Sequence, residues 1–246
     1  MTPCLLIPIY NQPQRIADVV ARLEPLRLPL LLVDDGSDAA TGVIIEQLAA
    51  RHPWLTLIRQ PHNRGRGAAL KIGYRIALER GFTHALQLDA DGQHDPSQLP
   101  PLLAAAREEP KALVLGVPIF DESAPAARLY GRWICRAWVW LETLSFRVRD
   151  PLCGLRCIPL EAMRVLLEER ALTDRMDFDV EQVVRLVWAG VPVRSVEVQV
   201  RYFDDGVSHY RVLRDNWLLS RLHARLCLEL LERALRGPQA RPVAGS

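Results

Sequence analysis

The sequence predicts an α/β protein with a doubly wound, mostly parallel central sheet and helices on both faces. Short, unbroken apolar runs alternate with longer segments of helical periodicity between residues 4 and 117. This alternation is typical of parallel strands joined by crossover helices, and strands buried on both faces read as continuous apolar runs. Acidic and polar residues directly follow several of the runs. Open α/β sheets bind ligands at those strand ends, so the pattern also indicates a site.

The expected strands in the first half are the apolar runs at residues 4–9, 30–33, 54–59, 85–89 and 112–117. Helices are expected between them at residues 13–26, 40–51, 67–79 and 95–108. Ser37 and Asp38 precede the second of these helices as candidate N-caps, and Asp95-Pro96 is a typical start for the fourth.

After Pro118 the pattern changes. Residues 124–144 form a long amphipathic segment in which arginines stand among four aromatic residues, Tyr130, Trp133, Trp138 and Trp140. We expect a turn and a short strand in residues 150–158, helices at 160–169 and 177–189, a strand at 191–202 and an amphipathic helix at 216–235. The chain thus divides into a main domain (1–202), a substrate-covering loop with the C-terminal helix (203–236) and a disordered tail (237–246).

The composition is that of an ordinary globular protein. The chain has 246 residues, of which 49% are hydrophobic and 24% charged, and its net charge of +2 gives no case for nucleic-acid binding. Five cysteines without a Cys-x-x-Cys pair indicate reduced thiols. No leader-like start and no apolar run approaching about 20 residues is present. We expect a cytoplasmic protein, which could also contact the inner face of the membrane peripherally.

The most informative segment is Leu88-Asp89-Ala90-Asp91-Gly92-Gln93-His94-Asp95-Pro96. Asp89 and Asp91, with one residue between them, follow an apolar run that is expected to be a buried strand. Removing an ionised carboxylate from water without a partner costs on the order of several kcal/mol. Mg²⁺ or Mn²⁺ is the natural partner for such oxygen ligands, and these cations commonly also hold substrate phosphates. The segment therefore predicts a metal-assisted site for a phosphate-bearing substrate.

Two further segments follow predicted strands. Asp35, in Val33-Asp34-Asp35-Gly36-Ser37, can accept hydrogen bonds from a nucleobase or a ribose, although Asp-Gly-Ser is also a common turn sequence. Residues 63–71 combine glycines, Arg66 and Lys71 at the start of a helix, which suits binding of a phosphate. The alternative is that the glycines are present only because the loop needs positive φ angles.

Taken together, Ile-Pro-x-Tyr-Asn, Val-Asp-Asp-Gly-Ser, Asn-x-Gly-x-Gly-x-Ala and Asp-Ala-Asp-Gly-Gln-His-Asp-Pro occur here in this order. In this combination they resemble family 2 glycosyltransferases of the GT-A fold, in the branch of the dolichyl- and polyprenyl-phosphate sugar synthases. The resemblance covers roughly residues 4–200. It implies a mostly parallel, Rossmann-like sheet and a transferase that uses a nucleotide-sugar donor.

The resemblance also implies residue roles on the donor side. Asp35 would contact the nucleobase in a pocket lined by residues 8–10, and Asp89 and Asp91 would hold Mg²⁺ or Mn²⁺ with Gln93 beside them. The cation would neutralise the departing nucleoside diphosphate. The full set expected to bind the nucleotide is Pro8, Tyr10, Asn11, Asp35, Arg66 and Asp89.

On the acceptor side, Cys153-Gly154-Leu155-Arg156 resembles the family segment beside the acceptor, where Gly154 would let sugar or acceptor pass close to the backbone and Arg156 would contact diphosphate or acceptor. Inverting members place a general base at the start of an acidic helix, here Asp179 first and Glu181 second. A pKa raised by burial would suit that base. The alternative is that these acids only complement the helix macrodipole.

Residues 205–215 follow the last expected strand. His209, Arg211 and Arg214 are expected to close over the diphosphate, with His209 as a third metal ligand or a pyrophosphate contact. The aromatic helices at 130–146 and 216–235 either pack on the core or lie on a bilayer surface.

The hypothesis is an inverting, metal-dependent glycosyltransferase that moves a hexose-type sugar from a nucleotide donor, preferably a UDP-sugar, to a lipid or polyprenyl-phosphate acceptor. A hydroxyl of a non-lipid acceptor is one alternative. A nucleotidyltransferase lacks support, because no Gly-rich basic segment follows residues 4–9. A non-catalytic nucleotide-sugar-binding or scaffold protein remains the third reading. Sequence reasoning leaves the sugar, the nucleobase and the oligomeric state open.

Overall fold

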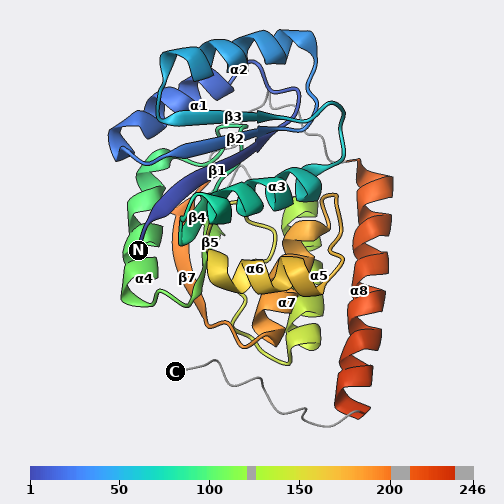
Figure 1. The fold of residues 1–246 in the computed structure, drawn as a ribbon. Helices are drawn as coiled ribbons and strands as arrows, with labels where there is room; N and C mark the ends of the chain where they lie inside the picture. Colours follow the sequence, from blue (N-terminus) through green and yellow to red (C-terminus); the bar gives the residue numbers. More distant parts are fainter. Residues whose placement is uncertain (121–125, 201–210, 236–246) are drawn as a thin grey trace.

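The computed structural model describes residues 1–120, 126–200 and 211–235, whose strands form one seven-stranded sheet in the order β3-β2-β1-β4-β6-β5-β7 (Figure 1). β6 runs antiparallel to its neighbours β4 and β5, and the other pairs are parallel. The predicted mostly parallel sheet is confirmed. The strands are β1 (Pro3–Ile9), β2 (Leu30–Asp34), β3 (Leu55–Arg59), β4 (His84–Gln87), β5 (Leu113–Ile119), β6 (Arg156–Pro159) and β7 (Val193–Gln199).

Helices cover both faces of the sheet, as expected from the sequence (Figure 1). One apolar core lies between the sheet and α1 (Ile16–Leu23), α2 (Ala39–Arg51) and α4 (Leu99–Glu108). The opposite core is covered by α3 (Arg66–Glu79), α5 (Ala126–Thr143), α6 (Leu160–Glu169), α7 (Phe178–Trp188) and α8 (Val212–Leu235). Two short 3₁₀ helices, η1 (Glu24–Leu26) and η2 (Pro96–Gln98), join these elements.

The strands bury both of their faces, which explains their unbroken apolar runs. In β1, Cys4 and Leu6 face the α3 side, whereas Leu5 and Ile7 face the α1 side. Successive side chains of a strand point to opposite faces, so each residue of such a run meets one of the two cores.

Local starts of helices follow the expected capping chemistry. Asp38 caps α2, where its Oδ1 accepts a hydrogen bond from the backbone N–H of Thr41 at 2.8 Å. Asp95 likewise accepts from the N–H of Ser97 at 2.9 Å and opens η2. These side chains satisfy N–H groups that have no partner inside the helix.

The boundaries differ from expectation in several places. β4 ends at Gln87, so Asp89 lies in the loop beyond the strand, and α1 begins at Ile16. The last helix begins at Val212, earlier than expected, since Asp215 accepts a hydrogen bond from the N–H of Arg211 at 2.6 Å. The expected loop from 203, with His209, and the expected tail at 237–246 lie outside the described residues.

All five cysteines lie in the described part and are free, and four of them are buried. None of the helices in the described ranges combines the length and the apolar character that crossing a membrane needs.

Candidate active site

Asp89 and Asp91 lie in the loop between β4 and η2, at the centre of the sheet, because β4 pairs with β1 on one side and β6 on the other. Asp91 is partly buried, and its Oδ1 accepts the N–H of Gln93 at 3.0 Å. Burial, and after it the charge of Asp89, raises the pKa of Asp91 to about 6. Two carboxylates one residue apart in this loop are candidate ligands for a cation.

The residues present fit a divalent cation that is only partly held by protein. The donors are hard carboxylate oxygens, which suit Mg²⁺ or Mn²⁺. Among the residues that the structure describes, no group of three or more His, Cys, Asp or Glu side chains is arranged to hold a metal. The two acids would therefore leave coordination positions for water and for substrate phosphates, which is the usual habit of Mg²⁺.

Arg66, the first residue of α3, joins this loop to α7. Its Nη1 lies 2.6 Å from Oδ1 of Asp89, and its Nε donates to Oδ2 of Asp179 at 2.6 Å. Burial opposes the charged form, but Asp179 and Asp89 outweigh it and raise the pKa of Arg66. A permanent positive charge thus lies directly beside the acids.

The glycines around Arg66 serve a close approach between protein segments. Gly65 has a φ of +113°, and a Cβ there would meet the carbonyl oxygen of Asp174 at 2.4 Å. A Cβ on Gly67 would meet the Cβ of Phe178, in α7, at 2.5 Å. These glycines therefore bring the starts of α3 and α7 together, which places Arg66 against Asp179.

Asp179 is buried in the first turn of α7 and accepts hydrogen bonds at both oxygens. Oδ2 accepts from Arg66, and Oδ1 accepts from Nε2 of Gln87 at 3.1 Å, with Nη1 of Arg156 at 3.5 Å. Burial alone would raise the pKa of Asp179, but Arg66 and then Arg156 outweigh it and lower the pKa. The raised pKa that would suit a general base is therefore not found at Asp179, because both cations lie against the carboxylate.

Glu181 is fully buried and lies among other partners. It accepts hydrogen bonds from the N–H of Thr173 at 2.8 Å, from Nε of Arg185 at 2.8 Å and from Nη2 of Arg225 at 2.6 Å. Asp179, and not Glu181, is the acid that the structure joins through Arg66 to the Asp89 loop.

Arg156 is also fully buried, at the start of β6. Its guanidinium donates to the carbonyls of Cys153, Pro151 and Asp179 at 2.7–2.8 Å. These bonds shape the loop that carries Gly154, and a contact of Arg156 to diphosphate or acceptor stays a prediction.

Gly154 lies directly against Asp89. A Cβ on Gly154 would be 2.2 Å from Oδ2 of Asp89, so the missing side chain makes room for that carboxylate. The sequence had suggested room for sugar or acceptor at this position. The described contact is with an acid of the site itself.

At the ends of β1 and β2, backbone groups hold the polar side chains. Asp35 accepts the N–H of Arg64 at 2.9 Å and that of Gly65 at 2.8 Å. Burial raises the pKa of Asp35, and these two hydrogen bonds counteract part of the rise. Asp35 thereby fastens the loop before α3 to the end of β2, and its contact with a nucleobase stays a prediction.

Asn11 links the neighbouring strand ends in the same way. Its φ is +47°, its Oδ1 accepts the N–H of Asp38 at 2.8 Å, and its own N–H donates to Oγ of Ser37 at 3.0 Å. Pro8 is buried in β1, and Tyr10 follows the strand half-buried. Pro8, Tyr10, Asn11 and Asp35 thus lie at or near the carboxyl ends of β1 and β2, and their contact with a nucleotide stays a prediction.

Sequence reasoning missed two buried polar residues of this region. Gln87, at the end of β4, donates to Asp179 and accepts from the hydroxyl of Tyr74 at 2.5 Å. His94 is buried with no partner at Nδ1, and burial lowers its pKa despite the charge of Asp89. A glutamine inside an apolar strand was the available signal for Gln87; His94 stood in the quoted motif.

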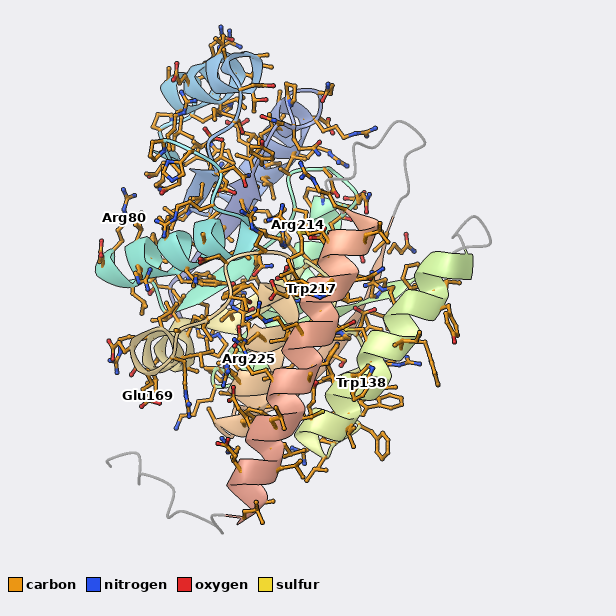
Figure 2. All side chains as sticks on the ribbon, turned by 90° about the vertical axis from the view of Figure 1, so that its right-hand side faces the viewer. Arg80, Trp138, Glu169, Arg214, Trp217 and Arg225 are labelled. Carbon is orange, nitrogen blue, oxygen red and sulfur yellow. The ribbon has the colours of Figure 1, made fainter. Side chains whose placement is uncertain are left out.

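The predicted diphosphate contacts on α8 begin at the helix start. Arg211 and Arg214 have exposed side chains there, and Arg214 is labelled in Figure 2. His209, predicted as a third metal ligand or a pyrophosphate contact, lies outside the described residues.

Comparison with known proteins places this geometry in a family. The model of glycosyl transferase family 2 matches residues 4–165. An undecaprenyl-phosphate mannosyltransferase of Micrococcus luteus is 28% identical over 208 residues, which are 81% of this chain and 82% of the relative. A UDP-N-acetylglucosamine–dolichyl-phosphate N-acetylglucosaminyltransferase of Methanococcus voltae is 27% identical over 182 residues, 67% of this chain and 72% of the relative.

Solved structures show the same fold at lower identity. Glucosyl-3-phosphoglycerate synthase from Mycobacterium tuberculosis, in complex with Mn²⁺ and UDP-glucose, is 17% identical with a TM-score of 0.66, covering 93% of this chain and 78% of that one. A mannosyltransferase from Pyrobaculum calidifontis, in complex with GDP-Man and Mn²⁺, is 18% identical with a TM-score of 0.63, covering 98% and 66%. The chain therefore belongs to glycosyl transferase family 2, as a GT-A glycosyltransferase of the branch that resembles polyprenyl- and dolichyl-phosphate sugar synthases.

Proposed function

We propose that the protein transfers a sugar, with inversion, from a nucleoside diphosphate donor to a polyprenyl-type lipid phosphate, with Mg²⁺ or Mn²⁺ held by Asp89 and Asp91. The named activities of the relatives support a lipid-phosphate acceptor. A UDP-sugar is the first choice of donor, and a GDP-sugar is the alternative, because similar folds are known in complex with each.

The observation that carries the proposal is the surroundings of Asp179. A hydroxyl acceptor needs a base to take its proton, whereas a phosphate acceptor already carries an anionic oxygen. Asp179 is the first candidate for that base, yet its two carboxylate oxygens already accept hydrogen bonds from Arg66 and Gln87. Its pKa is lowered, because Arg66 and Arg156 outweigh the opposing effect of burial. A carboxylate held in this way is a weak base.

Asp179 then acts as a positioning residue. It holds Arg66 beside Asp89, where the guanidinium can share the negative charge of the diphosphate. The bound cation would neutralise charge on the departing nucleoside diphosphate. The acceptor oxygen forms its bond to C1 as the bond from C1 to the diphosphate oxygen breaks, and the nucleoside diphosphate leaves with the electron pair. No proton has to be removed.

The acceptor is tested with a water-soluble, short-chain prenyl phosphate and the matching prenol. We expect transfer to the phosphate only. We also expect that Asp179→Asn keeps measurable transfer, lowered by about 10- to 100-fold through Arg66. Transfer to the prenol that Asp179→Asn abolishes would contradict the proposal and assign Asp179 as a base. Nucleotide-induced thermal stabilisation of the variant shows that its fold is intact.

The donor is tested by thermal shift with UDP, GDP, CDP and dTDP, each with and without Mn²⁺. A ligand at a hundredfold excess over its Kd stabilises the native state by about 2.7 kcal/mol. We expect one nucleotide to raise the melting temperature, only with the cation, and not in Asp91→Ala. Absence of any shift would favour a scaffold protein over an enzyme.

A further inference from the structure

The outer side of α5 and the loop after it expose an apolar stripe. Figure 2 shows α5 with Trp138 on this side. Exposed Tyr130, Ile134, Trp138 and Leu141 recur three or four residues apart along the helix, which puts them on one face. Cys135, Val139 and Glu142 of the opposite face are buried. The stripe consists of Tyr130, Trp133, Trp138, Leu141, Leu144 and Phe146, the last of which is 78% exposed.

α8 exposes a second stripe beside the first (Figure 2). Its buried side carries Leu222, His223 and Leu226. Its outer side carries Leu213, Trp217, Leu228, Leu231 and Leu235, and two of these, Leu213 and Leu235, are almost fully exposed. With 24 residues, α8 extends this apolar surface over about 36 Å. We call the two stripes together the α5–α8 face.

The two helices are fastened to each other. Trp138 stacks on His223, with ring centroids 5.8 Å apart, and Nδ1 of His223 lies 2.6 Å from Oε1 of Glu142. The α5–α8 face is thus continuous across both helices.

α8 is also fastened to the helix of the active site. Arg225 reaches the buried Glu181 of α7 at 2.6 Å, and Arg185 of α7 pairs with Glu229 of α8 at 2.8–2.9 Å. Figure 2 shows α8 beginning, at Arg214, toward the end of α3 that lies away from Arg80. That end of α3 carries Arg66. The face therefore keeps a set position relative to the acids of the site.

On the α8 side of the face the exposed charges include two arginines. Arg214 and Arg221 are exposed, and the guanidinium of Arg221 lies 5.5 Å over the ring of Trp217. The four arginines of α8 outnumber its three acids. Two of these acids are turned to internal partners, since Asp215 binds the N–H of Arg211 and Glu229 binds Arg185, and the third, Glu232, is exposed. A surface of tryptophan, leucine and arginine suits the boundary between lipid headgroups and acyl chains.

We propose that the α5–α8 face binds the surface of a bilayer containing anionic lipid, so that the strand-end edge of the sheet lies next to the membrane. The functional reason for this binding rests on the proposed function, because a lipid-phosphate acceptor would reach the active site from the membrane surface. Charge complementarity favours lipid over a second copy of this chain. A two-fold dimer through this face would bring its arginines toward their own copies.

The test is co-sedimentation of the full chain with phosphatidylcholine vesicles, with and without phosphatidylglycerol. We expect binding to the anionic vesicles that weakens as salt is raised. Leu231→Glu and Trp217→Ala should each lower the partition coefficient by about tenfold or more, because each removes apolar surface from the contact. Both side chains are 59% exposed, so the melting temperature should stay at the wild-type value.

A matched control is Val43→Glu on α2, where another large apolar side chain is 54% exposed. It should bind vesicles as the wild type does. Equal losses in Val43→Glu and Leu231→Glu would overturn the proposal, as would absence of binding to anionic vesicles. So would a dimer in solution that Leu231→Glu dissociates without changing vesicle binding.

The two proposals fail separately. Transfer to a soluble short-chain prenyl phosphate, without vesicles, reports on the proposed function alone, and Leu231→Glu should leave it unchanged. Asp91→Asn should abolish transfer and leave vesicle binding unchanged. If no sugar is transferred to the soluble prenyl phosphate while Leu231→Glu still loses vesicle binding, the membrane-binding face is supported and the lipid-phosphate acceptor is refuted. If transfer is present without vesicle binding, the bilayer surface falls.

Discussion

Two polar side chains at the ends of β1 and β2 are held in a different way from the buried charges of the α7–α8 side. At the ends of β1 and β2, Asn11 and Asp35 accept hydrogen bonds from backbone N–H groups. Around α7 and α8, buried side chains hold one another, as Glu181 does with Arg185 and Arg225. Truncating a side chain that is bonded to the backbone costs about one hydrogen bond. Truncating one member of a buried network of ion pairs costs more, because it leaves another buried charge without its partner.

This difference matters for the acceptor side of the site. Asp179 stands two residues from Glu181 in the first turn of α7, so the network that anchors α8 also sets the position of that turn. We therefore expect changes on the α7–α8 side to be more damaging to stability than changes at the strand ends. Glu181→Ala and Asn11→Ala test this contrast, and Asp91→Asn tests the charge held in the loop after β4.

Glu181→Ala should lower the free energy of unfolding by about 3 kcal/mol, because it removes one of the two carboxylates that contact Arg185, itself 7% exposed, and leaves only Glu229 to balance that charge. Urea unfolding measures the effect. Glu161→Ala on α6 is the matched control, since that glutamate is 75% exposed and pairs with Arg164 on the surface. It should stay within about 0.5 kcal/mol of wild type. Equal effects of the two variants would refute the contrast.

Asp91→Asn should stabilise the cation-free protein at pH 7 by an amount on the order of 1–3 kcal/mol. The folded-state pKa of Asp91 is raised to about 6, by burial and by Asp89, so the folded protein binds this proton more tightly than the unfolded chain. Its contribution therefore lowers stability as pH rises from about 4 to about 6, and the full cost remains above that range.

The melting temperature in EDTA between pH 4 and 7 measures this effect. The gain in Asp91→Asn should vanish toward pH 4, and the same variant should lose transfer by more than about 10²-fold. If the gain in melting temperature were the same at every pH in this range, titration of Asp91 would not be its cause. Asp18→Asn on α1, an exposed acid paired with Arg22, serves as the control and should leave both quantities unchanged.

Asn11→Ala should cost only about 1 kcal/mol, because it removes one side-chain acceptor for the N–H of Asp38. Asn11→Asp keeps an acceptor and tolerates the positive φ, so it should cost less. Thermal unfolding of the two variants checks the order. A loss in Asn11→Ala as large as that of Glu181→Ala would remove the distinction between the two sides.

Much of this architecture was predictable from local sequence. The strands appear as apolar runs because both faces of each strand are buried, and Asp38 and Asp95 cap helix starts as their residue types suggest. Asp89 and Asp91 stand out because ionised side chains directly follow an apolar strand. Each of these signals lies within a few residues, where spacing and residue type are informative.

The rest depends on contacts between distant segments. Arg66 and Asp179 are 113 residues apart, and no local pattern pairs them. The pKa of Asp179 is lowered by that pairing, against the effect of burial, so its direction depends on a contact that the sequence does not show. The antiparallel direction of β6 was also hidden, because an apolar run reads the same in a parallel or antiparallel strand. Gly154 was recognised as a close approach, but its neighbour, Asp89, was not.

The contact of Arg66 with Asp89 has a consequence for how the protein behaves before any substrate arrives. The guanidinium is an internal counterion, so a chelated sample should remain folded and soluble. Loading a cation is then an exchange against a side chain that is already in place. The apparent affinity for the free ion should be modest and should rise sharply when a nucleoside diphosphate gives Arg66 a second anion to contact. The metal content measured after purification would then depend on how much nucleotide stayed bound to the protein during purification.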